Sequence, residues 1–332
     1  MINYYILFNT FDTHFSTIHP NLFPMKLQSK QIKQTAQKQG FDLCGIAKAR
    51  RLVLEKERFK EALVRNYHDR KAYLERDVDK RFSPKLLLEN CKSVIVCAFN
   101  YNTKSPKLEI RNPKSEIRIA QYAQIRDYHV FMKEKLEALA QELQERYGFF
   151  NYKTAVDSSV ISEKAWAIQA GIGYYGKNGI IQTHIGSFIF LGSLLLDKEV
   201  DIYDIPDQKS CGDCCKCIVI CPTKAIVAPY YVNCSQCITH INYNKNETDF
   251  TRIAKYGWLI ACDECQNVCP NNANAPINEE AVAMRASFVE NQNEILGSLT
   301  PESFEKYFKD TVIYQFKYEG LRKRLENIGG LK

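Results

Sequence analysis

The amino-acid sequence predicts a mixed fold with an N-terminal α/β (α+β) domain, a small cysteine-rich domain and a short helical tail. Helical and β-branched apolar segments alternate through about residues 25–205, which is the pattern of an α/β domain. Ten of the thirteen cysteines lie between Cys211 and Cys269. A chain of 332 residues can form more than one hydrophobic core, so we expect separate domains.

The first half of the α/β domain is predicted from hydrophobic periodicity. Residues 27–39 form an amphipathic helix that ends at Gly40, and residues 41–47 form a buried strand. A charged helix is predicted over about 51–75. It precedes the β-branched apolar run 92–101, which is typical of an interior strand.

The second half continues the alternation of helices and strands. Asp127 is the expected N-cap of a helix whose apolar residues fall on one face. A strand ending at Val156, a helix over 162–169 and two apolar segments, 180–183 and 187–196, follow.

The domain boundaries are predicted from composition. Residues 1–24 lack the basic start and the cleavage site of a secretory signal, so we interpret them as an irregular extension. The polar segment 204–210 precedes the cysteines and contains a proline. We therefore place an α/β domain at 25–205, a cysteine-rich domain at 206–275 and a helical tail at 276–332.

Charge and hydropathy restrict the cellular setting. Lysine and arginine exceed aspartate and glutamate by seven (45 minus 38), which permits a polyanionic partner without requiring one. No apolar run reaches the roughly 18–20 residues that span a bilayer. We therefore predict a cytoplasmic protein without a membrane segment, in which clustered cysteines bind metal rather than form disulfides.

The strongest motif is a run of four cysteines with the spacing C-x2-C-x2-C-x3-C, followed by proline. Such a run binds a [4Fe-4S] cluster through three thiolates and supplies its fourth thiolate to a neighbouring cluster. A partial second copy, C-x2-C-x3-C followed by proline, predicts two clusters in a ferredoxin-like domain. The first run is Cys211, Cys214, Cys217 and Cys221, and the second is Cys262, Cys265 and Cys269.

The second copy lacks one thiolate, and Cys237 is its natural supplier. Cys215 and Cys234 compete on spacing, and we interpret both as bystanders. A pair of zinc sites is the alternative, although zinc sites do not require the two C-x3-C-Pro endings. The predicted ligands are Cys211, Cys214, Cys217 and Cys269 for the first cluster, and Cys221, Cys237, Cys262 and Cys265 for the second.

Further motifs occur in an order that is typical of one family. They are the segments 81–88, 122–129, 156–165, 170–178, 186–192, 221–226, 237–239 and 257–266. On these motifs the chain resembles the epoxyqueuosine reductase family over residues 25–330. Ile125 and Ser193 stand where the family usually has a glycine and a glutamate.

This resemblance implies the two-electron reduction of epoxyqueuosine to queuosine at the wobble position of tRNA. The α/β domain would bind cobalamin, which the two clusters supply with electrons from an external donor, and we expect a monomer. Asp157 would be the catalytic proton donor, buried against the cofactor and protonated near neutrality. The residues implied to bind cobalamin are Arg81, Asp157, Asn178, Ile181, Leu191, Cys262 and Asp263.

Other residues and functions stay open at this point. His129 is interpreted as a helix-cap or packing residue rather than a cobalt ligand. Arg322, Lys323 and Arg324 are candidates for contacts with tRNA phosphates or for an ordinary solvated helix face. The alternative functions are another corrinoid iron-sulfur reductase of the dehalogenase type, whose characteristic acid is a tyrosine, and a non-catalytic ferredoxin-type electron carrier.

Overall fold

A computed structural model describes residues 26–103, 117–244 and 250–328. The extension predicted at residues 1–24 lies outside the described residues. None of the described helices combines the length and the apolar composition needed to cross a membrane.

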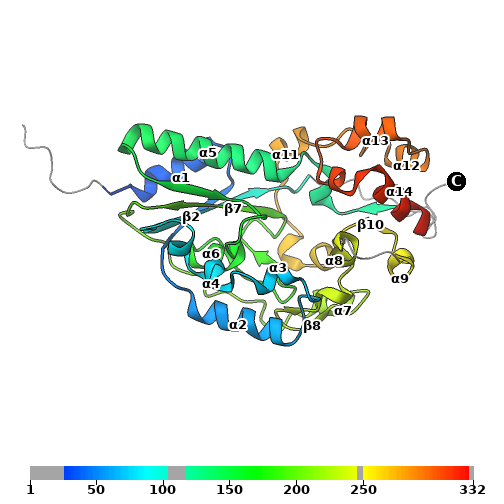
Figure 1. Ribbon diagram of the computed structural model, residues 1–332, viewed down its shortest axis with the longest axis horizontal. Helices are drawn as coiled ribbons and strands as arrows, with labels where there is room; N and C mark the ends of the chain where they lie inside the picture. Colours follow the sequence, from blue (N-terminus) through cyan, green and yellow to red (C-terminus); the bar gives the residue numbers. More distant parts are fainter. Residues whose placement is uncertain (1–25, 104–116, 245–249, 329–332) are drawn as a thin grey trace, which may run out of the picture.

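A four-stranded antiparallel sheet forms the centre of the N-terminal part (Figure 1). Its strand order is β1-β2-β7-β4, and every neighbouring pair is antiparallel. All eight residues of β2 are buried, which confirms the interior strand predicted from the apolar run 92–101. The strands are β1 (Leu43–Lys48), β2 (Ser93–Asn100), β4 (Tyr152–Ala155) and β7 (Ile189–Leu196).

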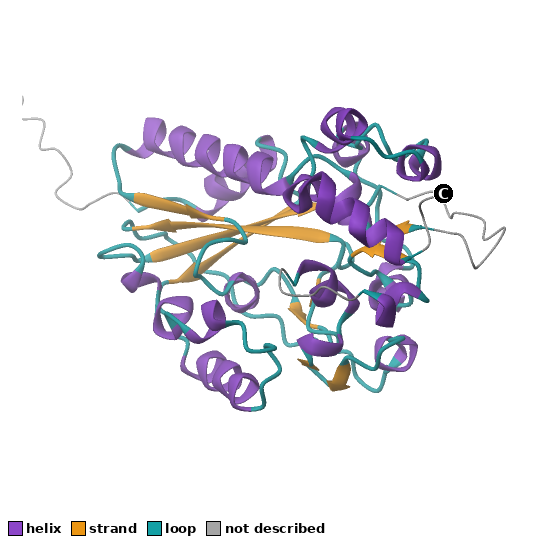
Figure 2. Ribbon diagram, turned by 45° about the vertical axis from the view of Figure 1, so that its right-hand side comes forward, coloured by secondary structure: helices purple, strands orange, loops and turns teal. Residues whose placement is uncertain are grey.

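Helices cover both faces of this sheet (Figure 2). On one face, α1 (Ser29–Lys38) and α5 (Tyr128–Tyr147) pack on a core that contains Phe99. On the other face, α6 (Glu163–Gln169) packs on a core that contains Trp166. Because side chains on both faces are covered, the two interior strands β2 and β7 are mostly apolar rather than alternating, whereas the edge strand β4 contains the exposed Lys153.

The N-terminal end of α5 confirms the predicted cap. The Asp127 carboxylate accepts a hydrogen bond of 2.9 Å from the backbone N–H of His129. This bond satisfies one of the otherwise unpaired donors of the first turn. The cap also fixes where His129 enters the helix, which matters for the site described below.

The charged helical stretch predicted over about 51–75 is helical at both ends but interrupted in the middle. The segment forms α2 (Val53–Val64) and α3 (Ala72–Glu75), and α4 (Val78–Phe82) follows. Asn66, Asp69 and Arg70 have φ values between 54° and 57°, in the left-handed region that a right-handed helix cannot contain. Periodicity could not reveal this break, because the break is stabilised by contacts with the cysteine-rich region.

These contacts hold the 66–71 loop against the cysteine-rich region. The backbone N–H of Cys234 donates to the Tyr67 carbonyl at 2.8 Å. The His240 ring nitrogen lies 3.0 Å from an Asp69 carboxylate oxygen, and both side chains are largely buried. The loop is therefore positioned by tertiary contacts from more than 160 residues further along the chain.

The cysteine-rich region consists of short elements separated by loops. Its helices are α7 (Lys216–Ile220), α8 (Ile238–Tyr243), α9 (Thr251–Ala254) and α10 (Glu264–Asn267). Its strands are β8 (Ile226–Ala228), β9 (Tyr231–Val232) and β10 (Trp258–Ile260). The hairpin of β5 (Tyr174–Tyr175) and β6 (Ile181–Gln182) precedes it.

A second large core joins the tail to the rest of the molecule. Strand β3 (Arg118–Ile119) pairs in parallel with β10, and apolar residues of 117–125 pack with residues of the tail such as Phe288 and Phe308. The predicted domain boundaries stay predictions, but this core is shared between segments on both sides of residue 206. The tail helices are α11 (Glu279–Ala283), α12 (Gln292–Gly297), α13 (Pro301–Phe308) and α14 (Lys317–Asn327).

The structure corrects one candidate for tRNA contact on α14. Arg324 is buried, its guanidinium lies over the rings of Phe250 and Phe316, and it donates to the Asn242 carbonyl at 2.8 Å. Arg324 is therefore a core residue. Arg322 pairs with Glu326 at 3.0 Å on the exposed face of the helix, as a solvated helix face would.

Gly45 tests the packing of β1 against α6. A Cβ atom at Gly45 would lie 1.9 Å from the carbonyl oxygen of Ala170, which ends α6. We expect Gly45→Ala to lower the free energy of unfolding by about 1–3 kcal/mol through overpacking. Gly297→Ala is the matched control, since nothing lies within 4 Å of its added Cβ. Equal apparent melting temperatures for the two variants would contradict the packing argument.

Candidate active site

The four thiols of the first predicted ligand set lie near one another. Burial raises the pKa of Cys217, and the neighbouring thiols of Cys211, Cys269 and Cys214 raise it further. Burial also raises the pKa of Cys269, which has Cys211 and Cys214 as neighbours. Cys269 follows α10, so α10 brings a distant cysteine to the group that surrounds α7.

The second predicted set forms a neighbouring group. Cys221 packs with Ala225 and Ile226 in a small apolar cluster, and Cys217, Cys237 and Cys265 lie against it. Burial raises the pKa of Cys265 to about 12, and the nearby thiol of Cys237 contributes. Burial likewise raises the pKa of Cys262, and Cys265 adds to the shift.

The surroundings of these thiols suit iron-sulfur clusters. Soft thiolates are the ligands that such clusters require, and cluster binding would keep the thiols ionised despite their raised pKa values. The backbone N–H of Ala225 donates to the Cys221 sulfur at 3.2 Å, a contact of the kind that tunes cluster sulfurs. Within the described ranges, no group of three or more His, Cys, Asp or Glu side chains forms a site for a single metal ion.

Two further cysteines lie beside the ligand sets. Cys215 is exposed. Cys234 is partly buried next to Cys237, and burial raises its pKa to about 11, while Lys164 and Lys71 act in the opposite direction. The role of bystander stays a prediction for both residues.

Asp157 begins the loop that follows β4. Its φ of 42° lies in the left-handed region, which is uncommon for a residue other than glycine, although aspartate and asparagine adopt it more readily than most. Its side chain is 57% exposed. The polypeptide by itself therefore does not bury this carboxylate, and the burial expected from the sequence has to come from a bound cofactor or substrate.

His129 joins Asp157 to a second carboxylate. Its Nε2 lies 3.0 Å from Asp157 Oδ2, and its Nδ1 lies 2.7 Å from Asp127 Oδ1. These hydrogen bonds, first to Asp127 and then to Asp157, raise the His129 pKa to about 9. The imidazole is therefore protonated near neutrality and donates from both ring nitrogens.

The sequence-based interpretation of His129 as a cap or packing residue was incomplete. Its backbone does take part in the cap, but its ring belongs to the acid site. Tyr128 stacks on His129 at 4.1 Å and on Phe190 at 4.2 Å between ring centroids. The ring is therefore oriented by packing as well as by its two carboxylate partners.

Glu163 lies at the acid site, although the sequence placed it only within a family motif and assigned it no role. It is the first residue of α6, and its Oε1 accepts a hydrogen bond of 2.9 Å from the Asp157 backbone N–H. Burial raises the pKa of Glu163 to about 8, and the nearby charge of Asp157 contributes. Two neighbouring carboxyl groups with different surroundings are typical of proton-transfer sites, although this property is invisible in the sequence.

Lys164 connects the acid site to the second set of thiols. Its Nζ donates to the Gly179 carbonyl at 2.8 Å. Partial desolvation lowers the pKa of this exposed residue, while the charges of Cys234, Glu163, Asp157 and Cys237 raise it. Lys164 is therefore within electrostatic range of both Asp157 and Cys237, a member of the second predicted ligand set.

Arg81 is the predicted cofactor residue that lies at the Asp157 loop. Its Nη1 donates to the Val160 carbonyl at 3.4 Å, and its Nη2 donates to the Tyr73 carbonyl at 2.6 Å. Its own carbonyl accepts from the Ser162 N–H at 3.0 Å. Arg81 thus connects α3 with the loop that carries the acid.

The other predicted cofactor residues lie nearer to the thiols or in the core. The buried Asn178 lies near Cys265, whose pKa its amide lowers, whereas Ile181 and Leu191 pack in the core beneath α6. Asp263 is buried and accepts from the Gln121 N–H at 2.6 Å, and burial raises its pKa to about 6. The structure thus places Asn178, Cys262 and Asp263 around Cys265, and Arg81 beside Asp157.

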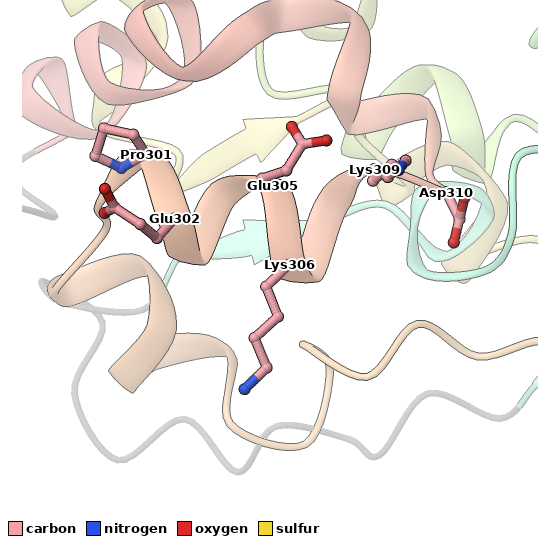
Figure 3. A pocket seen from close by; sticks show the side chains of 6 residues that line it. All are labelled: Pro301, Glu302, Glu305, Lys306, Lys309 and Asp310. Carbon is pink, nitrogen blue, oxygen red and sulfur yellow. The ribbon is translucent and has the colours of Figure 1, made fainter.

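A surface hollow beside α13 contains none of the predicted site residues. It is lined by residues of α13 and by the two residues after this helix (Figure 3). Its lining residues are Pro301, Glu302, Glu305, Lys306, Lys309 and Asp310. These charged side chains bring no metal-binding or proton-transfer chemistry comparable with that of the Asp157 site.

Comparison with known proteins gives the family. The profile described as "Epoxyqueuosine reductase QueG, DUF1730" matches residues 81–158, and the profile "4Fe-4S double cluster binding domain" matches residues 210–272. An epoxyqueuosine reductase from Cyclobacterium marinum is 36% identical over 299 residues, which cover 89% of this chain and 94% of that protein. This chain belongs to the epoxyqueuosine reductase family. A member from Cellulophaga algicola is 34% identical over 90% of this chain and 97% of its own length.

Solved structures of the family have the same fold. A crystal structure of epoxyqueuosine reductase with an epoxyqueuosine-modified tRNA-Tyr stem loop superposes with a TM-score of 0.81 and 25% identity, over 90% of this chain and 80% of that chain. A structure from Bacillus subtilis has its catalytic aspartate loop swung out of the active site. It superposes with a TM-score of 0.80 and 25% identity over the same shares. The family uses two [4Fe-4S] clusters and cobalamin, and the matched double-cluster region contains all eight predicted ligand cysteines.

The ligand assignment predicts which thiols determine the iron content. Cys265→Ser should remove one cluster and lower the iron content of anaerobically reconstituted protein from about eight to about four atoms. Cys215→Ser is the control and should keep the full content, because Cys215 belongs to neither set. Iron analysis together with electron paramagnetic resonance of the reduced protein measures both. A full iron content in the Cys265 variant would contradict the assignment.

The raised pKa of His129 predicts a pH-dependent contribution to stability. Its folded-state pKa of about 9 lies above the ordinary value of 6.5. Its stabilising contribution is therefore complete below pH 6.5 and lost as the pH rises through 9. The difference in melting temperature between the wild type and His129→Gln should be largest near pH 6 and small above pH 9. His184→Gln, at an exposed histidine, should show no such trend.

Proposed function

We propose that this protein reduces the epoxide of epoxyqueuosine to the alkene of queuosine at the wobble position of tRNA. The observation that carries the proposal is the arrangement of Asp157, a protonated His129 and the second group of cysteines in a member of this family. An electron carrier alone would need the cysteines but not the acid site. The aspartate at this site also favours this reaction over a dehalogenase-type reductase, whose characteristic acid is a tyrosine.

The reaction requires two electrons and two protons. The epoxide loses its oxygen as water, both C–O bonds break, and the two carbons become an alkene. Cobalamin, when bound, supplies the reduced cobalt centre through which electrons from the clusters reach the substrate. Arg81, Asp157, Asn178, Ile181, Leu191, Cys262 and Asp263 are the residues that we propose to hold it.

The chain itself provides the protons. The Asp157 side chain is 57% exposed, so we propose that it delivers a proton to the epoxide oxygen of a bound substrate. The protonated His129, whose Nε2 lies 3.0 Å from Asp157 Oδ2, holds the proton that Asp157 passes on. Glu163, protonated near neutrality because of burial, supports the Asp157 backbone and is a second proton reservoir.

The Asp157 loop is a candidate moving part. The B. subtilis enzyme has been seen with its catalytic aspartate loop swung out. In this chain the loop is held by the Arg81 contact to the Val160 carbonyl, while the Asp157 side chain is largely open to solvent. We propose that the loop closes on the substrate when tRNA binds.

The setting of the reaction follows from the same proposal. The substrate would be a tRNA anticodon stem loop, as in the complex solved for a similar protein. The electrons would come from an external donor whose identity stays open. A cytoplasmic location and a monomeric state remain predictions.

Asp157→Asn tests the proposed acid. Anaerobic turnover of epoxyqueuosine-containing tRNA, read as nucleosides by mass spectrometry, should depend on added cobalamin and a reductant. The variant should keep its iron and bound cobalamin but lose about 10²- to 10⁴-fold in rate, since the amide cannot donate the proton.

Asp310→Asn is the matched control, because Asp310 is exposed and lies on the hollow beside α13. This variant should turn over at the wild-type rate. Near-normal turnover by Asp157→Asn would show that Asp157 is not the proton donor. If the wild-type protein binds cobalamin and iron yet forms no queuosine, the proposed substrate is wrong.

A further inference from the structure

An exposed aromatic ring lies next to the acid site and has no role in the mechanism above. Tyr73 is on the one-turn helix α3, and 56% of its surface is exposed. Within the part of the chain that the structure describes, its hydroxyl has no hydrogen-bond partner. By contrast, Tyr101, Tyr122 and Tyr128 of the same region pack in or against the apolar cores. Packing therefore does not explain the position of Tyr73.

The position of Tyr73 relative to Asp157 is determined by one side chain. The Arg81 guanidinium donates to the carbonyl of Tyr73 at 2.6 Å and to the carbonyl of Val160, in the Asp157 loop, at 3.4 Å. The same guanidinium lies 5.7 Å from the centre of the Phe59 ring, so its orientation is held on another side. The planar guanidinium of Arg81 thus fixes the position of the α3 backbone relative to the acid loop.

Contacts on both sides of α3 hold this helix in place. After Tyr73, the Glu75 carboxylate lies 2.7 Å from a ring nitrogen of the buried His68. Before it, the 66–71 loop is held to the cysteine-rich region by the Asp69–His240 pair and by the Cys234 N–H. A four-residue helix has little stability alone, so these tertiary contacts are what present the ring.

Tyr73 lies within electrostatic range of the acid site. Burial raises its pKa, and the charges of Cys234 and Asp157 raise it further, while Arg81 lowers it. The charge of Asp157 thus acts on Tyr73, although more than half of the residue surface is exposed. Cys234, which also acts on Tyr73, is a neighbour of Cys237 in the second group of cysteines.

We propose that the Tyr73 ring is a stacking subsite for the substrate nucleobase when it is extruded from the anticodon loop. This inference rests on the proposed function. An enzyme that acts on a base within folded RNA must unstack that base, and an aromatic side chain replaces the lost stacking. An exposed ring that is positioned beside the proton donor can orient the base so that its epoxide side chain reaches Asp157.

Binding of two stem loops to three proteins tests the subsite. The ligands are an anticodon stem loop that carries epoxyqueuosine and the same stem loop with an abasic residue at that position. The proteins are the holoenzymes of the wild type, Tyr73→Ala and Tyr73→Phe. Tyr73→Ala should bind the epoxyqueuosine stem loop about 10- to 100-fold more weakly, and Tyr73→Phe should bind nearly as the wild type does.

The abasic stem loop identifies the contact. The wild type should lose affinity on removal of the base, whereas Tyr73→Ala should bind the abasic ligand as the wild type does, because the two changes remove the same interaction. Phe149→Ala is the matched control. Phe149 is 80% exposed just before β4, at the strand end opposite to Asp157, and its replacement should change neither affinity.

Several results would overturn this subsite. If Tyr73→Ala loses the same affinity for both stem loops, the contact lies outside the base. If Tyr73→Phe loses as much affinity as Tyr73→Ala, the hydroxyl rather than the ring makes the contact. A reduced cobalamin content of Tyr73→Ala would make Tyr73 a cofactor residue. If the wild type forms queuosine yet binds both stem loops equally, only the subsite fails; if it forms none, the proposed function fails with it.

Discussion

The eight cysteines predicted to bind the clusters come from three separate stretches of chain, and their convergence shapes the rest of the molecule. The stretches are 211–221, Cys237 and 262–269. Short helices and loops bring them together, and the parallel pairing of β3 with β10 ties this region to the segment that precedes α5. The shared core behind this pairing includes the tail helices. The tail therefore supports the cysteine-rich region rather than forming a separate appendage.

The acid site depends on the same arrangement. Asp157 follows β4, His129 begins α5 and Glu163 begins α6, so three ends of secondary structure meet at one edge of the sheet. A histidine between two carboxylates becomes a stable cation, and a carboxyl group buried beside it becomes a neutral acid. The site thus holds protons in groups of different affinity, which suits a reaction that consumes two of them.

Lys164 and Arg81 connect this edge to its neighbours in different ways. Lys164 lies between the acids and the thiol of Cys237, where a positive charge balances the negative groups on both sides. Arg81 joins two backbone segments by hydrogen bonds rather than by an ion pair. Because the acid loop starts in a left-handed conformation at Asp157, such restraints decide where its side chain points.

The sequence by itself determined the class of fold, the family and the double-cluster region, because the spacing of cysteines within a short run is a local property. It also located the interior strand β2 and the Asp127 cap, which depend on periodicity and on a single side chain. It did not determine the break at residues 66–71, the role of the His129 ring or the protonation of Glu163. These features arise from contacts between residues far apart in the chain and from burial, which only the tertiary structure creates.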